Sequence, residues 1–161
     1  MFKGSIPAVI TPFDTNKSID YDKLNKHIDF LIDQESHGLV SCGTTGESPT
    51  LDHEEHKKIT EAIIKRSNKK VPIMAGCGSN STKESIELVK HAKSAGANAS
   101  LLVSPYYNKP SQDGLFQHFS EIANSVPSLP IYLYNIPGRS VVNINQVTMT
   151  MLSKIDNIVG V

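Results

Sequence analysis

The sequence has few of the features that mark a membrane, secreted or nucleic-acid-binding protein. Its apolar runs are all far shorter than the roughly 20 residues that a membrane-spanning helix needs. The N-terminus has no apolar signal-peptide core, so we expect a cytoplasmic protein. Lysine plus arginine and aspartate plus glutamate both number 16. Because basic residues are neither in excess nor clustered, we expect neither nucleic acid nor a membrane as partner.

Cysteine and metal-ligand patterns are also scarce. The two cysteines, Cys42 and Cys77, are expected to be free thiols, because no secretory signal points to an oxidising compartment. His53 and His56 lie three residues apart without a third ligand nearby in sequence, a pattern more typical of a polar helix face than of a metal site. There is no Gly-rich dinucleotide fingerprint and no P-loop. We therefore expect no metal and no nucleotide cofactor.

What the sequence does contain is a repeat of short, apolar, β-branched segments. Their spacing of about 30 residues is the size of one βα unit. Between the segments, apolar residues recur at helical spacing, and a capping box is expected at Asp52 with Glu55 and at Ser81 with Glu84. No linker interrupts the series, so we expect one α/β domain over residues 1–161. The segments begin near Ile6, Gly38, Val71, Ser100, Ile131 and Ile158.

Two architectures fit alternating β and α elements, a doubly wound open sheet and a (β/α)8 TIM barrel. The length favours the open sheet, because a complete barrel typically has about 250 residues. The polar residues favour the barrel, because they follow almost every predicted strand, whereas an open sheet concentrates its site residues at one switch point. We therefore predict a TIM barrel of which this chain supplies about the first six strands.

Hydroxyl groups and one arginine gather after the predicted strands. Residues 43–48 (GTTGES) place Thr44 and Thr45 between glycines at a strand end, where a small anion can be held. Tyr107 and Tyr134 follow later strands and could pass protons, although half-buried tyrosines with a purely structural role remain an alternative. Arg139 could bind a carboxylate in bidentate fashion. This combination favours a small-acid substrate.

Four motifs together make the sequence recognisable. They are residues 10–12 (ITP), 43–48 (GTTGES), 105–112 (PYYNKPSQ) and 134–139 (YNIPGR). Through these motifs the chain resembles the dihydrodipicolinate synthase family, a branch of the pyruvate-dependent class I aldolases that also include N-acetylneuraminate lyase. The resemblance covers essentially the whole chain.

The resemblance implies a lyase of lysine biosynthesis with a (β/α)8 barrel. A lysine on strand six forms a Schiff base with pyruvate, and the resulting enamine adds to aspartate semialdehyde, whose adduct cyclises to 4-hydroxy-tetrahydrodipicolinate without a metal or organic cofactor. Carried over by position, Thr45 holds the pyruvate carboxylate. Thr44, Tyr107 and Tyr134 form a proton relay, and Arg139 binds the carboxylate of the aldehyde substrate.

The resemblance also implies regulation and assembly. The family forms homotetramers as dimers of dimers, and Tyr107 is lent across an interface to the neighbouring subunit. In many members free lysine inhibits the enzyme by binding at the dimer interface. The positions of that allosteric site are occupied here by Ser48, Pro49, His53, His56, Asn80, Glu84 and Tyr106.

The sequence departs from the family pattern in three places. Pro49 stands where a small residue such as alanine is common, and Ser140 and Val141 stand where the family has Thr-Gly. The chain ends at Val161, directly before the expected Schiff-base lysine, so we expect a barrel domain truncated before its end. Two alternatives stay open: a sister pyruvate-dependent aldolase acting on a sugar acid, and a non-catalytic module that binds a small acid.

Overall fold

The computed structural model describes residues 2–161, which form two compact units. The first unit contains the chain up to Gly76 and the segment Ser94–Asn98. The second contains Cys77–Lys93 and Ala99–Val161. Helices and strands alternate in both units, and every strand pair within a unit is parallel. The predicted α/β class is therefore confirmed.

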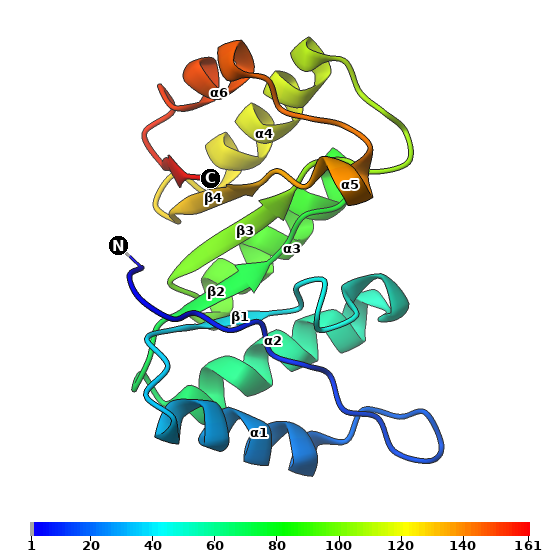
Figure 1. Ribbon diagram of the computed structural model, residues 1–161, viewed down its shortest axis with the longest axis vertical. Coiled ribbons are helices and arrows are strands. Elements are labelled where there is room, and N and C mark those ends of the chain that lie inside the picture. The colour runs from blue at the N-terminus through cyan, green and yellow to red at the C-terminus, as the bar shows by residue number, and fades with distance from the viewer. Residues whose placement is uncertain (1) are drawn as a thin grey trace. The chain divides into compact units, whose positions relative to one another are not determined.

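In the first unit, two parallel strands lie beside two helices that pack against each other (Figure 1). The strand register pairs Leu39 with Ile73 and Ser41 with Ala75. All residues of both strands are buried, as expected for a parallel sheet. The elements are α1 (Tyr21–Asp33), β1 (Leu39–Ser41), the short 3-10 helix η1 (Ser48–Thr50), α2 (His53–Ser67) and β2 (Ile73–Gly76).

Local sequence signals explain where these helices begin. The Asp20 carboxylate accepts a hydrogen bond from the Lys23 N–H at 2.9 Å and caps α1. At α2 the predicted capping box is present in full: the Asp52 side chain accepts from the Glu55 N–H, and the Glu55 side chain accepts from the Asp52 N–H. The apolar stripes of both helices enter one core, made of Val9, Leu24, Ile28, Leu39, Cys42, Ile59, Ile63 and Ile73.

The second unit contains three parallel strands, with β4 between β3 and β5. Helices α4 and α6 pack against each other beside these strands (Figure 1). The glycine that follows α3, Gly96, belongs to the first unit and has a left-handed φ of 99°, as is common at a helix C-terminus. The elements are α3 (Thr82–Ala95, whose last two residues are counted in the first unit), β3 (Ala99–Val103), α4 (Gln112–Ser125), β4 (Ile131–Tyr134), α5 (Pro137–Ser140), α6 (Gln146–Leu152) and β5 (Ile158–Gly160).

The predicted number of strands needs one correction. The first predicted strand, near Ile6, forms only an isolated parallel bridge between Ala8 and Val40, so residues 2–161 contain five strands rather than six. Within this bridge the Val9 N–H donates to the Val40 carbonyl, and the Val40 N–H donates to the carbonyl of Pro7. Proline has no N–H to donate, which limits the ladder that this segment can form.

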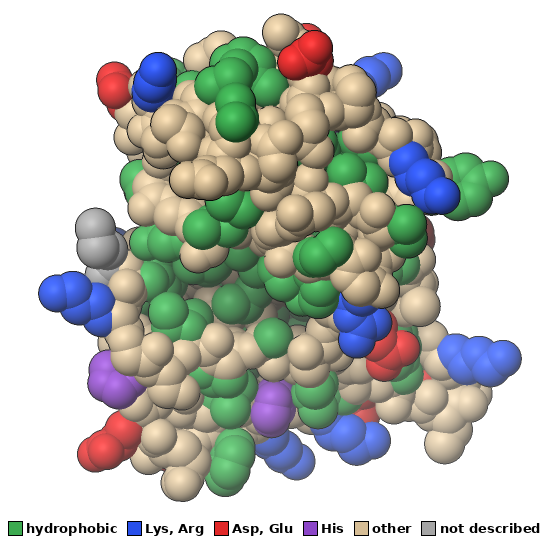
Figure 2. Space-filling view, turned by 45° about the horizontal axis from the view of Figure 1, so that its top comes forward, with side chains coloured by type: hydrophobic (Ala, Val, Ile, Leu, Met, Phe, Trp, Pro, Cys, Tyr) green, Lys and Arg blue, Asp and Glu red, His purple; other side chains and the backbone are tan. Residues whose placement is uncertain are grey.

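The surface agrees with the balanced charge of the sequence. On the face shown in Figure 2, lysine, arginine, aspartate and glutamate side chains are scattered rather than gathered in an area of one sign. Within residues 2–161, none of the helices is both long and apolar enough to cross a membrane.

Candidate functional site

In the first unit, the predicted threonine pair lies on a tight turn directly after β1. The Gly46 N–H donates to the Gly43 carbonyl at 3.0 Å, and the Glu47 N–H donates to the Thr44 carbonyl at 3.1 Å. These successive bonds fold the chain back on itself over four residues. Both Thr44 and Thr45 are exposed, and within residues 2–161 neither hydroxyl forms a hydrogen bond. Both hydroxyls are therefore available to a ligand.

The turn is fixed to the segment that precedes α1. The Thr11 hydroxyl donates to the Gly46 carbonyl at 2.7 Å, and this hydrogen bond is buried. A Cβ at Gly46 would lie 2.8 Å from the Val9 carbonyl oxygen, which is too close for any other residue. Glycine is therefore required here for a close approach of two backbones, and the threonine pair is held in one place.

Four of the predicted lysine-binding residues lie on η1 and on the first turns of α2. Ser48 and Pro49 are in η1, and Pro49 occupies its first turn, where its fixed φ suits a helix start. His53 is exposed, whereas His56 is buried on the inner face of α2. The position of His56 follows from the helix period, since it shares a face with the core residue Ile59.

Cys42 lies beside this segment but is poorly suited to chemistry. Burial raises the pKa of its thiol to about 12, because the thiolate would be taken out of water. Its Sγ lies 3.5 Å from the His56 carbonyl oxygen and 3.6 Å from the Thr60 hydroxyl. Both cysteines are free and buried, which confirms the prediction that they are thiols rather than disulfide partners.

In the second unit, Tyr134 is the last residue of β4, and Arg139 lies on the short helix α5 that follows. Tyr134 is half-buried and Arg139 is exposed. Within residues 2–161, neither side chain forms a hydrogen bond or an ion pair. A phenol and a guanidinium without protein partners, close in sequence after a strand end, are therefore free to contact a substrate.

A network of side-chain amides holds the segment that carries Arg139. The Asn135 side chain donates to the Asn143 side chain at 2.8 Å and accepts from the Ile144 N–H at 3.1 Å. From the start of α4, the Gln112 amide donates to the Asn143 carbonyl at 2.9 Å and accepts from the Thr148 hydroxyl at 2.8 Å. These hydrogen bonds fix the ends of the segment 135–145 to α4 and to the start of α6.

The family departure at Ser140 and Val141 has a clear structure. The Ser140 hydroxyl is buried and lies within hydrogen-bond distance of the Ile136 carbonyl at 3.1 Å and the Val142 carbonyl at 2.9 Å. Val141 ends α5 with a left-handed φ of 62°, which is uncommon for a β-branched residue. The family glycine would adopt this φ without strain.

Tyr106 and Tyr107 follow β3 on a turn that contains two residues with positive φ. Tyr107 has a φ of 73°, and Lys109 has a φ of 45°. The Tyr107 side chain is 89% exposed, whereas Tyr106 is half-buried. An aromatic side chain so fully exposed is unusual, and it is available to a partner.

Asn80 lies on the loop between β2 and α3, and Glu84 lies in the first turn of α3. The Ser79 hydroxyl donates to the Glu84 carboxylate at 2.6 Å, and the Ser79 N–H donates to the Ser85 hydroxyl at 2.9 Å. The Asn108 side chain donates to the Asn80 carbonyl at 3.1 Å. The structure therefore joins this loop to the turn that carries the two tyrosines.

Sequence reasoning missed three of these supporting residues, Ser79, Asn108 and Gln112. Each forms hydrogen bonds within a loop or to a residue distant in sequence. Neither kind of hydrogen bond leaves a periodic pattern in the sequence. The available signal was position: all three lie in the polar segments that follow strands.

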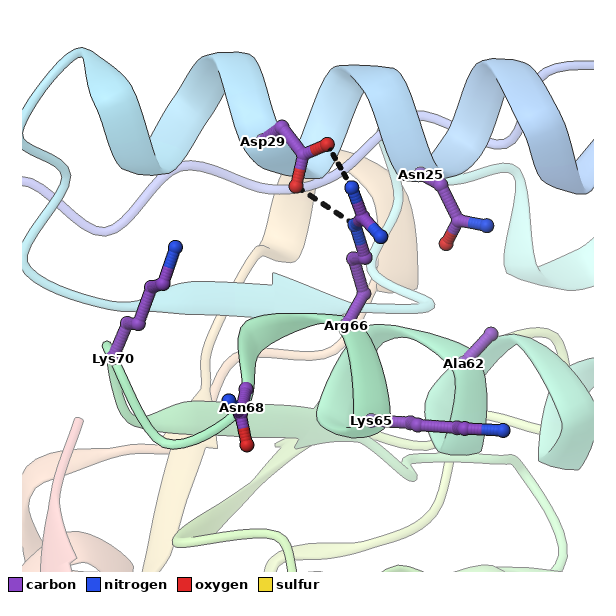
Figure 3. A pocket seen from close by; sticks show the side chains of 7 residues that line it. All are labelled: Asn25, Asp29, Ala62, Lys65, Arg66, Asn68 and Lys70. Carbon is purple, nitrogen blue, oxygen red and sulfur yellow. Dashed lines mark hydrogen bonds and ion pairs between the residues drawn. The ribbon is translucent and has the colours of Figure 1, made fainter.

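Two further features of the described residues bear on ligand binding. Within residues 2–161, no group of three or more His, Cys, Asp or Glu side chains is placed to hold a metal ion. A hollow of about 590 Å³ lies between α1 and the last turns of α2, at the other end of α2 from His53. Figure 3 shows Arg66 of this hollow in a bidentate ion pair with Asp29, which lowers the pKa of that carboxyl.

Comparisons with known proteins give the context of these residues. The sequence profile of the dihydrodipicolinate synthetase family matches residues 1–161. The chain is 57% identical to the 4-hydroxy-tetrahydrodipicolinate synthase of Rhizobium meliloti and 56% identical to that of Agrobacterium fabrum. In both cases the match covers the whole chain and 55% of the relative, so the chain spans about half the length of these curated relatives.

Solved structures that resemble this chain come from the same family as these relatives. A dihydrodipicolinate synthase from Acinetobacter baumannii complexed with pyruvate is 48% identical, with a TM-score of 0.97 over 99% of this chain and 55% of that one. The enzyme from Cyanidioschyzon merolae with lysine bound is 39% identical, with a TM-score of 0.95 over 98% of this chain and 54% of that one. The fold is therefore part of the (β/α) barrel of these enzymes, as predicted. The chain belongs to the dihydrodipicolinate synthetase family.

Proposed function

We propose that the full-length protein containing this chain condenses pyruvate with aspartate semialdehyde to give 4-hydroxy-tetrahydrodipicolinate, in the cytoplasm and without a metal or organic cofactor. Family membership over the whole chain is the observation that carries this proposal. The free hydroxyls and the free guanidinium after the strands support it, because Schiff-base chemistry needs groups that bind carboxylates and move protons.

In this proposal the turn after β1 binds pyruvate. The exposed Thr45 hydroxyl donates to the pyruvate carboxylate, and the neighbouring Thr44 hydroxyl belongs to the proton relay. The tight turn supports these roles, because Gly46 and Thr11 hold both hydroxyls in place without using them. Preorganised donors of this kind act without a cost of reorganisation during the reaction.

The second unit supplies the proton transfer and the second substrate site. Tyr134 donates and accepts the proton as the Schiff base forms and converts to the enamine, and Tyr107 continues the relay. Arg139 binds the carboxylate of the semialdehyde. The amide network around Asn135 and Gln112 supports this role, because it fixes the segment that carries the guanidinium. The lysine that forms the Schiff base would follow Val161.

We further propose that the two units belong to one barrel domain, that the protein is a homotetramer, and that Tyr107 enters the site of a neighbouring subunit. The 89% exposure of this tyrosine supports a role in an interface. Lysine would inhibit the enzyme by binding to the residues predicted for it. Acceptors for the ammonium and donors for the carboxylate are both present in that set, from Ser48 to Tyr106.

Borohydride trapping tests the central step. The full-length protein is incubated with pyruvate, reduced, and weighed by intact-mass spectrometry, and a mass increase of one reduced pyruvate adduct is expected. Product analysis with aspartate semialdehyde and with sugar-acid aldehydes then identifies the acceptor. A protein that traps no pyruvate is not an aldolase, and one that accepts only sugar-acid aldehydes is the sister enzyme.

A titration tests the regulation. Lysine at millimolar concentration is expected to lower the condensation rate of the full-length protein. A rate that stays constant over this range contradicts the proposed inhibition and leaves the catalytic proposal intact.

A further inference from the structure

Tyr107 lies at the corner of a three-residue turn that is strained. The Asn108 N–H donates to the Tyr106 carbonyl at 2.9 Å, and the φ of Tyr107 between them is 73°. This bond and this φ are those of the γ-turn with positive φ, which is rare because it crowds the side chain of any residue except glycine. Residues 106–108, here called the Tyr107 turn, therefore need an outside contact that keeps them in this conformation.

Packing within the chain does not supply that contact at the tyrosine itself. Its side chain is 89% exposed, and no hydrogen bond within residues 2–161 involves its hydroxyl. The residues on both sides in the turn are also half-buried or exposed.

The contact with the rest of the chain is made by the residue after Tyr107, Asn108. The Asn108 side-chain amide donates to the carbonyl of Asn80, a residue 28 positions away, at 3.1 Å. Within residues 2–161 it is the one side-chain hydrogen bond formed by residues 105–109. Asn108 thus links the Tyr107 turn to a separate loop.

The loop on the other side of this hydrogen bond is well anchored. Ser79 donates from its N–H to the Ser85 hydroxyl and from its own hydroxyl to the Glu84 carboxylate. The Ser81 N–H donates back to the Ser79 hydroxyl at 3.1 Å. The Asn80 carbonyl therefore belongs to a fixed loop and can restrain the turn bonded to it.

We infer that Asn108 is a positioning residue, whose amide holds Tyr107 in its strained conformation and couples it to the loop of Asn80. Through Ser79 that loop is bonded to Glu84 in the first turn of α3. The functional half of this inference rests on the proposed function, in which Tyr107 moves protons while Asn80 and Glu84 bind lysine. A ligand that shifts the Asn80 carbonyl then reaches Tyr107 through one hydrogen bond. This provides a short route from the inhibitor site to the proton relay.

Two variants of the full-length protein test the inference. Asn108→Ala removes the side chain, and Asn108→Asp keeps its size but has no N–H to donate. Asn124→Ala, at an exposed position of α4, is the matched control. Hydrogen–deuterium exchange is measured on peptides covering residues 104–110. Exchange is expected to be several times faster in both Asn108 variants and unchanged in the control.

Steady-state kinetics tests the functional part of the inference, namely that Asn108 affects both catalysis and inhibition by lysine. In both Asn108 variants kcat for the condensation is expected to fall roughly three- to tenfold, the range for loss of one hydrogen bond, while KM for pyruvate stays constant. The lysine concentration for half-inhibition is expected to rise by a similar factor. A purely structural role would instead change the melting temperature and leave both quantities as in the control.

The outcomes separate this inference from the function it builds on. Unchanged exchange in the Asn108 variants overturns the positioning role, whatever the enzyme does. Faster exchange with unchanged kcat and unchanged inhibition overturns the coupling. A wild-type protein that traps no pyruvate refutes the proposed function, and the exchange measurement still decides whether Asn108 holds the turn.

Discussion

At the residue scale, Tyr134 is the side chain whose proposed role is easiest to isolate. It ends β4 half-buried and without a hydrogen-bond partner in residues 2–161, so Tyr134→Phe removes one hydroxyl and little packing. We expect kcat of the full-length protein to fall roughly 100-fold or more, the usual effect of losing a positioned proton donor. Steady-state kinetics with both substrates measures the change.

Tyr132 provides the matched control, since it is half-buried on the same strand two residues earlier. Tyr132→Phe is expected to retain kcat within about twofold. Equal losses in both variants would mean that the strand, rather than the Tyr134 hydroxyl, determines the rate.

His118 predicts a pH dependence of stability. Its side chain is buried on α4, its Nδ1 lies 2.9 Å from the Thr82 hydroxyl, and burial lowers its pKa from 6.5 to about 4. Because the folded pKa lies below the unfolded one, the unfolded chain binds the proton first as the pH falls. The stability contributed by the neutral imidazole is therefore complete above pH 6.5 and is lost as the pH falls toward 4, by about 3 kcal/mol at most.

The variant His118→Gln removes this titration. At pH 8 it is expected to melt below the wild type because it packs less well, and the gap between the two melting temperatures should narrow as the pH is lowered to 4.5. Thermal melts of the two full-length proteins between pH 8 and pH 4.5 measure this gap. A gap of constant size would show that His118 is not responsible for acid sensitivity.

At the element scale, the end of α5 stores strain at Val141. This residue has a φ of 62° and is 64% exposed, so it gains little from packing while its branched side chain is crowded. Val141→Gly is expected to raise the free energy of unfolding. Relief of the left-handed strain contributes about 1 kcal/mol, and the larger backbone entropy that glycine loses on folding reduces this gain. Denaturant melts measure the difference.

The exposed Val147 in the first turns of α6 serves as the comparison, because it sits in a regular helix. Val147→Gly is expected to lower stability, by up to about 0.5 kcal/mol. Effects of the same sign in the two variants would contradict the assignment of strain to Val141.

At the scale of the whole molecule, β5 leaves an open edge. It pairs with β4, and no other strand in residues 2–161 pairs with it. Val159 is 41% and Val161 73% exposed beside this edge. An unpaired strand with exposed apolar side chains favours association with other chains. We expect the 161-residue chain, expressed alone, to self-associate at micromolar concentration in analytical ultracentrifugation.

Charged substitutions test whether the open edge of β5 causes the self-association. The double variant Val159→Lys and Val161→Lys is expected to shift association to concentrations several times higher, because lysine protects natural sheet edges. Val147→Lys, which also removes an exposed apolar side chain but on a helix, should have a smaller effect. Association that responds equally to both would place the contact elsewhere.

The order of the elements and much of the site's composition could be predicted from local sequence patterns. Helix starts such as Asp52 with Glu55, and the helix end at Gly96, depend on residues within four positions of each other, so they can be identified from local pattern. The polar residues after each strand were visible for the same reason, since strand ends follow directly from the apolar runs. Family membership then followed from the motifs.

How those residues are held depends on contacts that form only in the folded chain. The bond from Asn108 to Asn80, and those from Gln112 to Asn143 and Thr148, join positions about 30 residues apart, and no periodic pattern announces them. The positive φ of Tyr107 and Val141 contradicts the preference of their side chains, so local propensity could not indicate it. Strain of this kind persists only because distant contacts outweigh it, and those contacts exist only once the chain has folded.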